Sequence, residues 1–349
     1  MNDSLTASAF AAGPRARGLL FHYAASLNPE LANATPPASV LALAHVPDDD
    51  VDPALLFRAL TQAVDDAMYW GPPYSLDRVL AAPELRPALE ELAARVLPSP
   101  AAAWWFRPMA HPQYQVWWED LDPARPAAEA PPSPAVILEQ DARDGARTEQ
   151  EMRRHYRWHP RREVSGAWWS TPPYQLLATS GWIEVPAGTA PAFAGDAAEP
   201  IPARHGPSGL YLVEDSLGYE LARVDDFPVP DGARVYEIAV PEDFAALVAR
   251  YPREVTWTQR ADWGQTTGRA GRWLAVDWQR AAQDWDAVHL TAAAYLAGAT
   301  CVLPVAGDAA TVMAGWAPDT TRWLTAVAAT QPLAQDPPPA RTRWFTVEY

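Results

Sequence analysis

Apolar side chains recur every three to four residues within residues 51–70, VDPALLFRALTQAVDDAMYW. Leu56 and Leu60 begin one apolar face, and this spacing is typical of an amphipathic helix. Asp52 stands where an N-cap residue accepts backbone hydrogen bonds, and Pro53 suits the first helical position. The sequence therefore predicts a helix that begins after Asp52.

The rest of the first third of the chain is also mainly helical by pattern. Ser75 and Glu84 open two shorter predicted helices. Residues 1–18 show no sustained periodicity and are expected to form a flexible tail, and residues 19–25 are strand-like. We therefore expect a mainly helical region over residues 19–121.

A proline- and alanine-rich stretch at 122–134 is expected to be a linker. An α+β catalytic domain is expected over 135–330, followed by a C-terminal loop and strand at 331–349. Within 135–330, the residue types and the helix-start signals predict several elements. The expected strands lie at 135–138, 208–215, 234–240 and 286–291, and the expected helices at 241–252 and 276–285. The predicted fold class is α+β, with a helical N-terminal region packed on a C-terminal domain with a mixed or antiparallel sheet.

The chain is strongly acidic, with a formal charge of −16 over 349 residues. Such a charge opposes nucleic-acid binding and attraction to an anionic membrane, although a local basic patch can reverse this at one site. A small-molecule ligand or nucleotide is the expected partner, and a protein partner stays open. Because no apolar segment has the pattern of a signal peptide or a membrane span, we expect a cytoplasmic protein.

All 27 basic residues are arginine, since the sequence contains no lysine. This excludes a Schiff base to pyridoxal phosphate, a phosphate-loop lysine and a Ser-x-x-Lys pair, because arginine stays protonated. Cys301 is the only cysteine, so a multi-cysteine metal site is also excluded. We expect neither pyridoxal phosphate nor a metal.

The stretch SGAWWSTPP places two tryptophans beside two hydroxyl residues. One indole can line a cleft and stack on a nicotinamide, a base or a sugar, with the hydroxyls bonding the same ligand. Alternatively, both indoles belong to the core and the Thr-Pro pair begins a turn. The candidate ligand-binding residues here are Trp168, Trp169, Ser170 and Thr171.

Two arginine-rich stretches are candidates for anion binding. Residues 151–163, EMRRHYRWHPRRE, bring five arginines together with His155 and His159. They suit an anion, a metal on the histidine pair, or pairing with the surplus carboxylates of the chain. Residues 260–269 form a polar stretch with a predicted loop character. Its candidate cofactor-binding residues are Arg260, Asp262, Thr267 and Arg269.

Several acidic and histidine side chains lie at predicted element ends. His289 follows Asp286 in DAVHLT, where a histidine can act as a base oriented by a carboxylate, or can simply be a core residue. Glu214 ends a predicted strand and offers a general base, a ribose ligand or a structural carboxylate.

Several motifs resemble a family found in high-GC bacteria: SGAWWSTPP, LVEDSLG, VYEIAVP, DWGQTTGR, DWQRAAQDWDAVHLT and AGWAPDTTRWL. They occur in this order over most of residues 160–327. This resemblance by itself implies no activity.

The layout also resembles that of ADP-ribosyltransferases, which carry a His or Arg on an early strand, an aromatic-Ser-Thr element and a later acidic residue. His22, the WWST stretch, and Glu237 or Asp286 would take these places, although His22 lies far from WWST and a Glu-x-Glu pair is absent at 235–240. The resemblance implies an enzyme that uses NAD and transfers ADP-ribose to an acceptor. The candidate catalytic residues are His22, Glu237, Asp286 and His289.

Two alternatives stay open at this point. One is a hydrolase or natural-product tailoring enzyme on a small aromatic or sugar substrate, in which His289 and a carboxylate serve as acid and base. The other is a tryptophan- and arginine-rich protein-binding module without catalysis, because these two residue types dominate binding hot spots.

Overall fold

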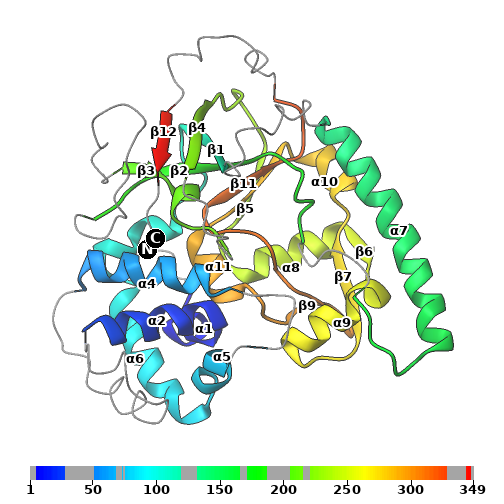
Figure 1. The fold of residues 1–349 in the computed structure, drawn as a ribbon, viewed down its shortest axis with the longest axis horizontal. Coiled ribbons are helices and arrows are strands. Elements are labelled where there is room, and N and C mark those ends of the chain that lie inside the picture. Colours follow the sequence, from blue (N-terminus) through cyan, green and yellow to red (C-terminus); the bar gives the residue numbers. More distant parts are fainter. Residues whose placement is uncertain are drawn as a thin grey trace.

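A computed structural model describes the chain in segments, shown in Figure 1. The described residues are 5–27, 51–67, 73, 75–118, 132–165, 171–186, 205–214, 221–327 and 343–346.

Helices make up most of the described N-terminal region and lie together at the lower left of Figure 1. Their bounds are α1 Ala7–Ala12, α2 Pro14–Leu27, α4 Pro53–Asp65, α5 Ser75–Leu80, the 3₁₀ helix η2 Pro83–Leu85, α6 Arg86–Val96 and the 3₁₀ helix η3 Pro100–Phe106. Helix α4 begins as predicted, because the Asp52 carboxylate accepts hydrogen bonds from the N–H groups of Ala54 and Leu55.

The larger sheet has eight strands in the order β12-β4-β1-β2-β11-β8-β5, with β3 beside β2. Neighbours are antiparallel except β5 and β8, which run parallel. The strand bounds are β1 Gln113–Trp118, β2 Ala178–Glu184, β3 His205–Pro207, β4 Leu221–Phe227, β5 Val235–Ile238, β8 Ala287–Leu290, β11 Thr320–Trp323 and β12 Arg343–Thr346.

A smaller sheet has the order β6-β7-β10-β9 and is also mixed. Its strands are β6 Pro252–Glu254, β7 Arg272–Val276, β9 Leu303–Ala306 and β10 Ala309–Thr311. The remaining helices are α7 Pro134–Trp158, the 3₁₀ helix η4 Ser208–Leu210, α8 Pro241–Arg250, α9 Thr256–Thr267, α10 Trp278–Asp284 and α11 Ala292–Gly298. The fold is therefore α+β, with N-terminal helices and a C-terminal mixed-sheet region, as the sequence predicts.

The N-terminal helices and the sheet region share one hydrophobic core. Buried side chains from both regions, such as Phe10 and Leu60 on one side and Leu247 and Trp316 on the other, belong to the same contacting set. The two regions approach closely at Gly13, where an added Cβ would lie 2.4 Å from the carbonyl oxygen of Leu296 on α11. None of the described helices is long and apolar enough to cross a lipid bilayer.

Two N-terminal predictions are wrong within the described residues. The predicted tail at 1–18 contains α1 and the start of α2, and Phe10 is fully buried. The predicted strand at 19–25 is part of α2. Local alternation is weak there, and burial of Leu19 and Leu20 against neighbouring helices determines the structure.

Three C-terminal predictions are also wrong. Residues 135–138 begin the long helix α7 and do not form a strand, and residues 208–215 begin with η4. The polar stretch at 260–269 is mostly helix α9, because Ala261 and Trp263 bury one side of it. By contrast, β5, β8, α8 and α10 lie within their predicted ranges. Of the predicted linker, residues 122–131 lie outside the described residues.

Candidate functional site

A row of polar side chains crosses one face of the larger sheet. The register pairs Glu237 of β5 with His289 of β8, His289 with Thr321 of β11, and Thr321 with Thr179 of β2. Side chains of paired residues lie on the same face of a sheet. The next pair along, Ile238 and Leu290, faces the opposite way and is fully buried in the hydrophobic core. Polar residues at the alternate positions therefore mark this face as a candidate site.

The centre of the site is a linear set of three ionisable groups, which we call the Glu237–His289–Asp319 relay. The Nδ1 atom of His289 lies 2.6 Å from Oε2 of Glu237, and its Nε2 atom lies 3.4 Å from Oδ1 of Asp319. The second contact is an ion pair and not a hydrogen bond. Ser208 closes the set by donating its hydroxyl hydrogen to Oδ2 of Asp319 over 2.6 Å.

The three members of the relay differ in their exposure to solvent. The side chain of Glu237 is 31% exposed, that of Asp319 is 9% exposed, and that of His289 is fully buried. Glu237 is therefore the member of the relay that a ligand from solution can reach. Its other oxygen, Oε1, accepts a hydrogen bond of 2.9 Å from the N–H group of Met109. Both carboxylate oxygens are thus fixed by donors.

The two carboxylates keep His289 protonated. Burial of the imidazole opposes its charged form, but the carboxylates of Asp319 and Glu237 on its two sides outweigh burial and raise the pKa of His289 to about 9. At neutral pH the ring is therefore an imidazolium, which donates to Glu237 and cannot serve as a base. With both carboxyl groups ionised, the relay carries a net charge of −1.

Neutral hydrogen bonds hold the sheet face beside the relay. Thr179 donates to Oε1 of Gln113 over 2.7 Å and accepts from the indole N–H of Trp323 over 2.9 Å. The Gln113 amide in turn donates to the carbonyl of Ala110. This anchors the segment that supplies the Met109 N–H group. Asp319 has a φ of 53°, a left-handed conformation that costs about 1–3 kcal/mol and needs support from its neighbours.

The arrangement is not a serine-nucleophile triad. The hydroxyl hydrogen of Ser208 goes to Asp319, so His289 does not activate this serine. Nor do the relay side chains converge on one point. Among the described residues, no group of three His, Cys, Asp or Glu side chains is placed to hold a metal ion.

Two of the four predicted catalytic residues come together, and two lie elsewhere. Glu237 and His289 are in direct contact in the relay. Asp286 instead forms a bidentate ion pair with Arg234, in which its two oxygens lie 2.9 and 3.1 Å from the guanidinium nitrogens. His22 lies on α2 and bonds Asp66 over 2.9 Å, so the early strand implied for it is wrong.

The predicted ligand-binding stretch at 168–171 is described only at its last residue. Trp168, Trp169 and Ser170 lie outside the described residues. Thr171 is buried and donates its hydroxyl hydrogen to the carbonyl of Ala314, while its own carbonyl accepts from the indole of Trp278. The contacts of Thr171 are thus structural.

The four candidate residues of the 260–269 stretch lie on or just after α9, and each has an internal partner. Arg260 pairs with Glu163 and stacks on Tyr156, and Arg269 donates to the carbonyl of Asp308. Asp262 accepts from Ser165, and Thr267 bonds the carbonyl of Trp263. Arg260 and Arg269 line an open cavity of about 500 Å³ that does not include the relay.

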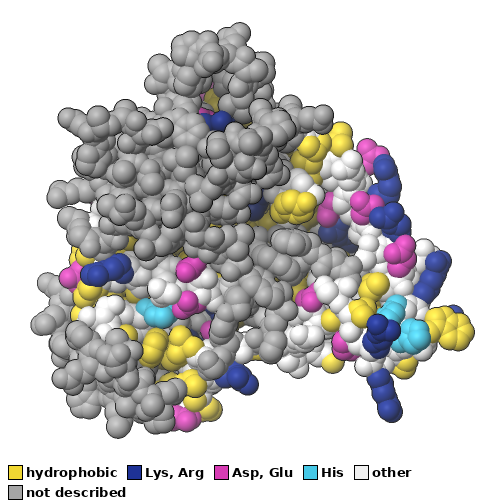
Figure 2. Space-filling view, viewed as in Figure 1, with side chains coloured by type: hydrophobic (Ala, Val, Ile, Leu, Met, Phe, Trp, Pro, Cys, Tyr) yellow, Lys and Arg dark blue, Asp and Glu magenta, His cyan; other side chains and the backbone are white. Residues whose placement is uncertain are grey.

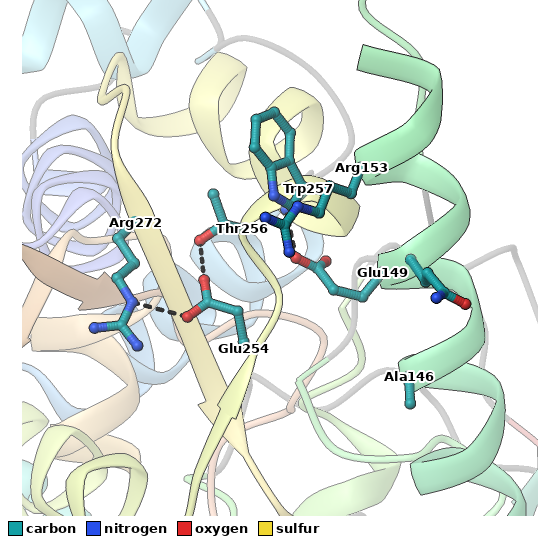
Figure 3. Close-up of a pocket in the computed structure, with 8 residues that line it drawn as sticks. Ala146, Glu149, Arg153, Glu254, Thr256, Trp257 and Arg272 are labelled. Carbon is teal, nitrogen blue, oxygen red and sulfur yellow. Dashed lines mark hydrogen bonds and ion pairs between the residues drawn. The ribbon is translucent and has the colours of Figure 1, made fainter. Parts of the chain in front are cut away.

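A second cavity of about 710 Å³ lies between α7 and the start of α9 (Figure 3). Glu254 on one wall bonds Arg272 over 2.8 Å and accepts from Thr256. Glu149 on the other wall accepts from the N–H groups of Trp257 and Thr258, so this carboxylate already occupies the amino end of α9. The carboxylates of this cavity therefore serve packing between elements.

A further buried carboxylate, Glu214, lies toward the opposite face of the sheet. The residue as a whole is only partly buried, but its oxygen Oε1 is enclosed. Burial raises the pKa of this carboxyl group to about 8, although a hydrogen bond from Tyr295 acts in the opposite direction. Arg15 of the N-terminal helix α2 and Arg322 of β11 also attract it. Glu214 thus joins the packing between the helices and the sheet.

Sequence reasoning missed Asp319, Ser208 and the Met109 N–H group. Of these three residues, Asp319 had a signal in the sequence, because it lies in the motif AGWAPDTTRWL. Nothing local marks Ser208 or Met109, because only the sheet register and the packing of the segment before β1 bring them to the relay.

No protein-family model, no curated protein and no solved structure matches this chain. Its function is therefore inferred from the geometry of the site.

Proposed function

We propose that the protein is an enzyme that cleaves a glycosidic bond, with Glu237 as its reactive carboxylate and NAD as its substrate. The observation that carries this proposal is the relay itself. A partly exposed carboxylate is fixed at both oxygens and backed by a buried imidazolium and a second carboxylate.

The charge of the relay favours a cationic reacting centre. Breaking a glycosidic bond creates positive charge on the sugar carbon, and a fixed carboxylate stabilises such charge better than water, because it needs no reorganisation. A net charge of −1 would repel a phosphate or a carboxylate at the same position. Glu237 therefore suits the ribose carbon that carries a positively charged nicotinamide ring.

The number of accessible acids favours NAD over an ordinary sugar. Hydrolysis of an O-glycoside usually requires a second carboxylic acid that protonates the leaving group. In NAD the C1′–N bond breaks with its electron pair going to the ring nitrogen, so nicotinamide leaves as a neutral molecule without a proton. Within the relay Glu237 is the exposed carboxylate, and the buried His289 is shielded from a ligand. Water or an acceptor hydroxyl then bonds to C1′ and loses its proton to Glu237 or to solvent.

The partners of Glu237 have distinct roles in this proposal. Met109 and His289 orient the carboxylate, because each donates a hydrogen bond to one of its two oxygens. Asp319 holds His289 protonated and is a positioning residue. Arg260 and Arg269 have no part in this step, because they line a separate cavity. Stacking of nicotinamide on Trp168 or Trp169 stays a prediction.

The test is product analysis with purified protein. Wild type is incubated with NAD, purine nucleosides and nitrophenyl glycosides, and release of nicotinamide, base or nitrophenol is followed by chromatography. We expect nicotinamide from NAD, and a loss of about 10²–10⁴-fold in Glu237→Gln. Glu242→Gln, a change in the first turn of α8, is the matched control and should keep full activity. Equal rates in both variants would refute the role of Glu237. Release of nitrophenol alone would favour a sugar hydrolase instead.

A further inference from the structure

A strongly basic patch surrounds the carboxyl end of α7. We call it the α7 basic patch, and its members are Arg153, Arg154, Arg157, Trp158, Arg161 and Arg162. Figure 2 shows arginine and histidine side chains gathered beside an exposed hydrophobic group at the lower right, where α7 ends. The patch lies apart from the relay and does not rest on the proposed function.

In the part of the chain that the structure describes, the arginines of the patch are not used in ion pairs with carboxylates. All five are exposed, and within the described residues none forms an ion pair. Earlier on the same helix, Arg143 and Arg147 pair with Glu139 and Asp144. Like charges at helical spacing, such as Arg153 and Arg157, destabilise a helix slightly. Within the described residues, the patch therefore lacks the ion pairs that Arg143 and Arg147 form earlier on α7.

The patch also exposes a large aromatic surface. Trp158 is 74% exposed, whereas Tyr156 two residues earlier is buried. The guanidinium of Arg157 lies 5.8 Å from the centre of the Trp158 ring, so the two side chains form one amphipathic surface. Tryptophan and arginine are the residue types that contribute most at binding hot spots.

The charge of the remaining molecule selects the class of partner. Nucleic acid is a long polyanion, and it would have to run from the patch along a protein whose formal charge is −16 even with these arginines included. Single-stranded binding also uses successive aromatic side chains, and here one indole is exposed in the patch. A short acidic peptide needs no extended basic track. Its carboxylates fit the forked guanidinium donors, and one apolar side chain covers an indole.

We propose that the α7 basic patch docks an acidic segment of a protein partner. Aspartate or glutamate side chains of that segment pair with the patch arginines, and an apolar side chain of the segment packs on Trp158.

Fluorescence anisotropy tests this proposal with the full chain and a labelled peptide of four Glu-Glu-Leu repeats. The double variant Arg154→Glu/Arg157→Glu should weaken binding by about tenfold or more, since two favourable pairs become repulsive. Trp158→Ala should weaken it several-fold. The matched control is Arg143→Glu/Arg147→Glu, which changes the net charge by the same amount on the same helix. It should stay within about twofold of wild type.

Three outcomes would overturn the proposal. The first is that wild type does not bind the peptide. The second is that the patch variant and the control variant lose equal affinity for the peptide. The third is that oligo-dT or phosphatidylserine vesicles bind more tightly than the peptide and through the same patch. Circular dichroism of each variant checks that α7 and the fold are retained, which we expect because all the changed side chains are exposed.

Discussion

Because His289 is protonated in the folded protein, the free energy of unfolding should decrease as the pH rises above neutral. The pKa of this buried imidazole is about 9 in the folded protein and 6.5 for an ordinary histidine. A pKa that is higher in the folded state stabilises that state below the unfolded pKa, and the contribution is lost as pH rises through the folded value. The stabilisation is therefore complete below about pH 6.5 and disappears above about pH 9.

The expected magnitude follows from the difference between the two pKa values. One pKa unit corresponds to about 1.4 kcal/mol, so this shift contributes about 3 kcal/mol. His289→Gln removes the titrating group and keeps a polar side chain of similar reach. The free energy of unfolding of wild type minus that of His289→Gln should fall by about 3 kcal/mol between pH 6 and pH 10.

Urea unfolding followed by tryptophan fluorescence and by circular dichroism measures this difference. Agreement of the two probes establishes two-state behaviour, which a free-energy comparison requires. All other titrating groups are common to the two proteins, so the contributions of the groups that do not contact His289 cancel. If the difference between wild type and variant is the same at pH 6 and pH 10, His289 is not held protonated by its two carboxylates, and the electrostatic description of the relay is wrong.

Two further predictions concern the framework of the site and of α9. Gly181→Ala places a Cβ 2.8 Å from that of Ala110, so it should cost about 1–3 kcal/mol and lower activity through the Met109–Glu237 hydrogen bond. Gly264→Ala on α9 places its Cβ 3.5 Å from the carbonyl oxygen of Arg269, an ordinary contact, and should be neutral or stabilising in thermal melts. Glu149→Gln weakens the acceptor at the amino end of α9 and should lower the free energy of unfolding in urea by about 1 kcal/mol. Glu151→Gln changes an exposed side chain on the same helix and should lower it little. Equal effects of the two changes would show that Glu149 does not cap α9.

Local signals were sufficient for part of the fold. Helix α4 was predicted from Asp52 and the apolar spacing because capping and amphipathicity are properties of adjacent residues. Strand β5 was predicted from its Tyr, Val and Ile content, and β8 from its place directly after a predicted helix. The helical assignments failed where tertiary burial decides, as in α2, and where polar residues and glycine suggest a loop, as in α9.

The site was predictable only in pieces. Glu237 and His289 were each singled out, but their contact depends on the parallel pairing of β5 and β8, which no local pattern specifies. Asp319 joins them because β11 is the next strand of the sheet, and Ser208 because η4 follows β3. Asp286 was a reasonable acidic candidate from its position before β8, but its ion pair with Arg234 occupies it.

Chemical rescue tests the role of Glu237 most directly. Glu237→Ala removes the carboxylate and leaves room beside His289, and formate in the buffer can supply a carboxylate in its place. We predict that Glu237→Ala releases nicotinamide from NAD at least about 10²-fold more slowly than wild type, and that formate restores part of the rate while leaving wild type unchanged. Nicotinamide release by Glu237→Ala at the wild-type rate, without formate, would contradict the account.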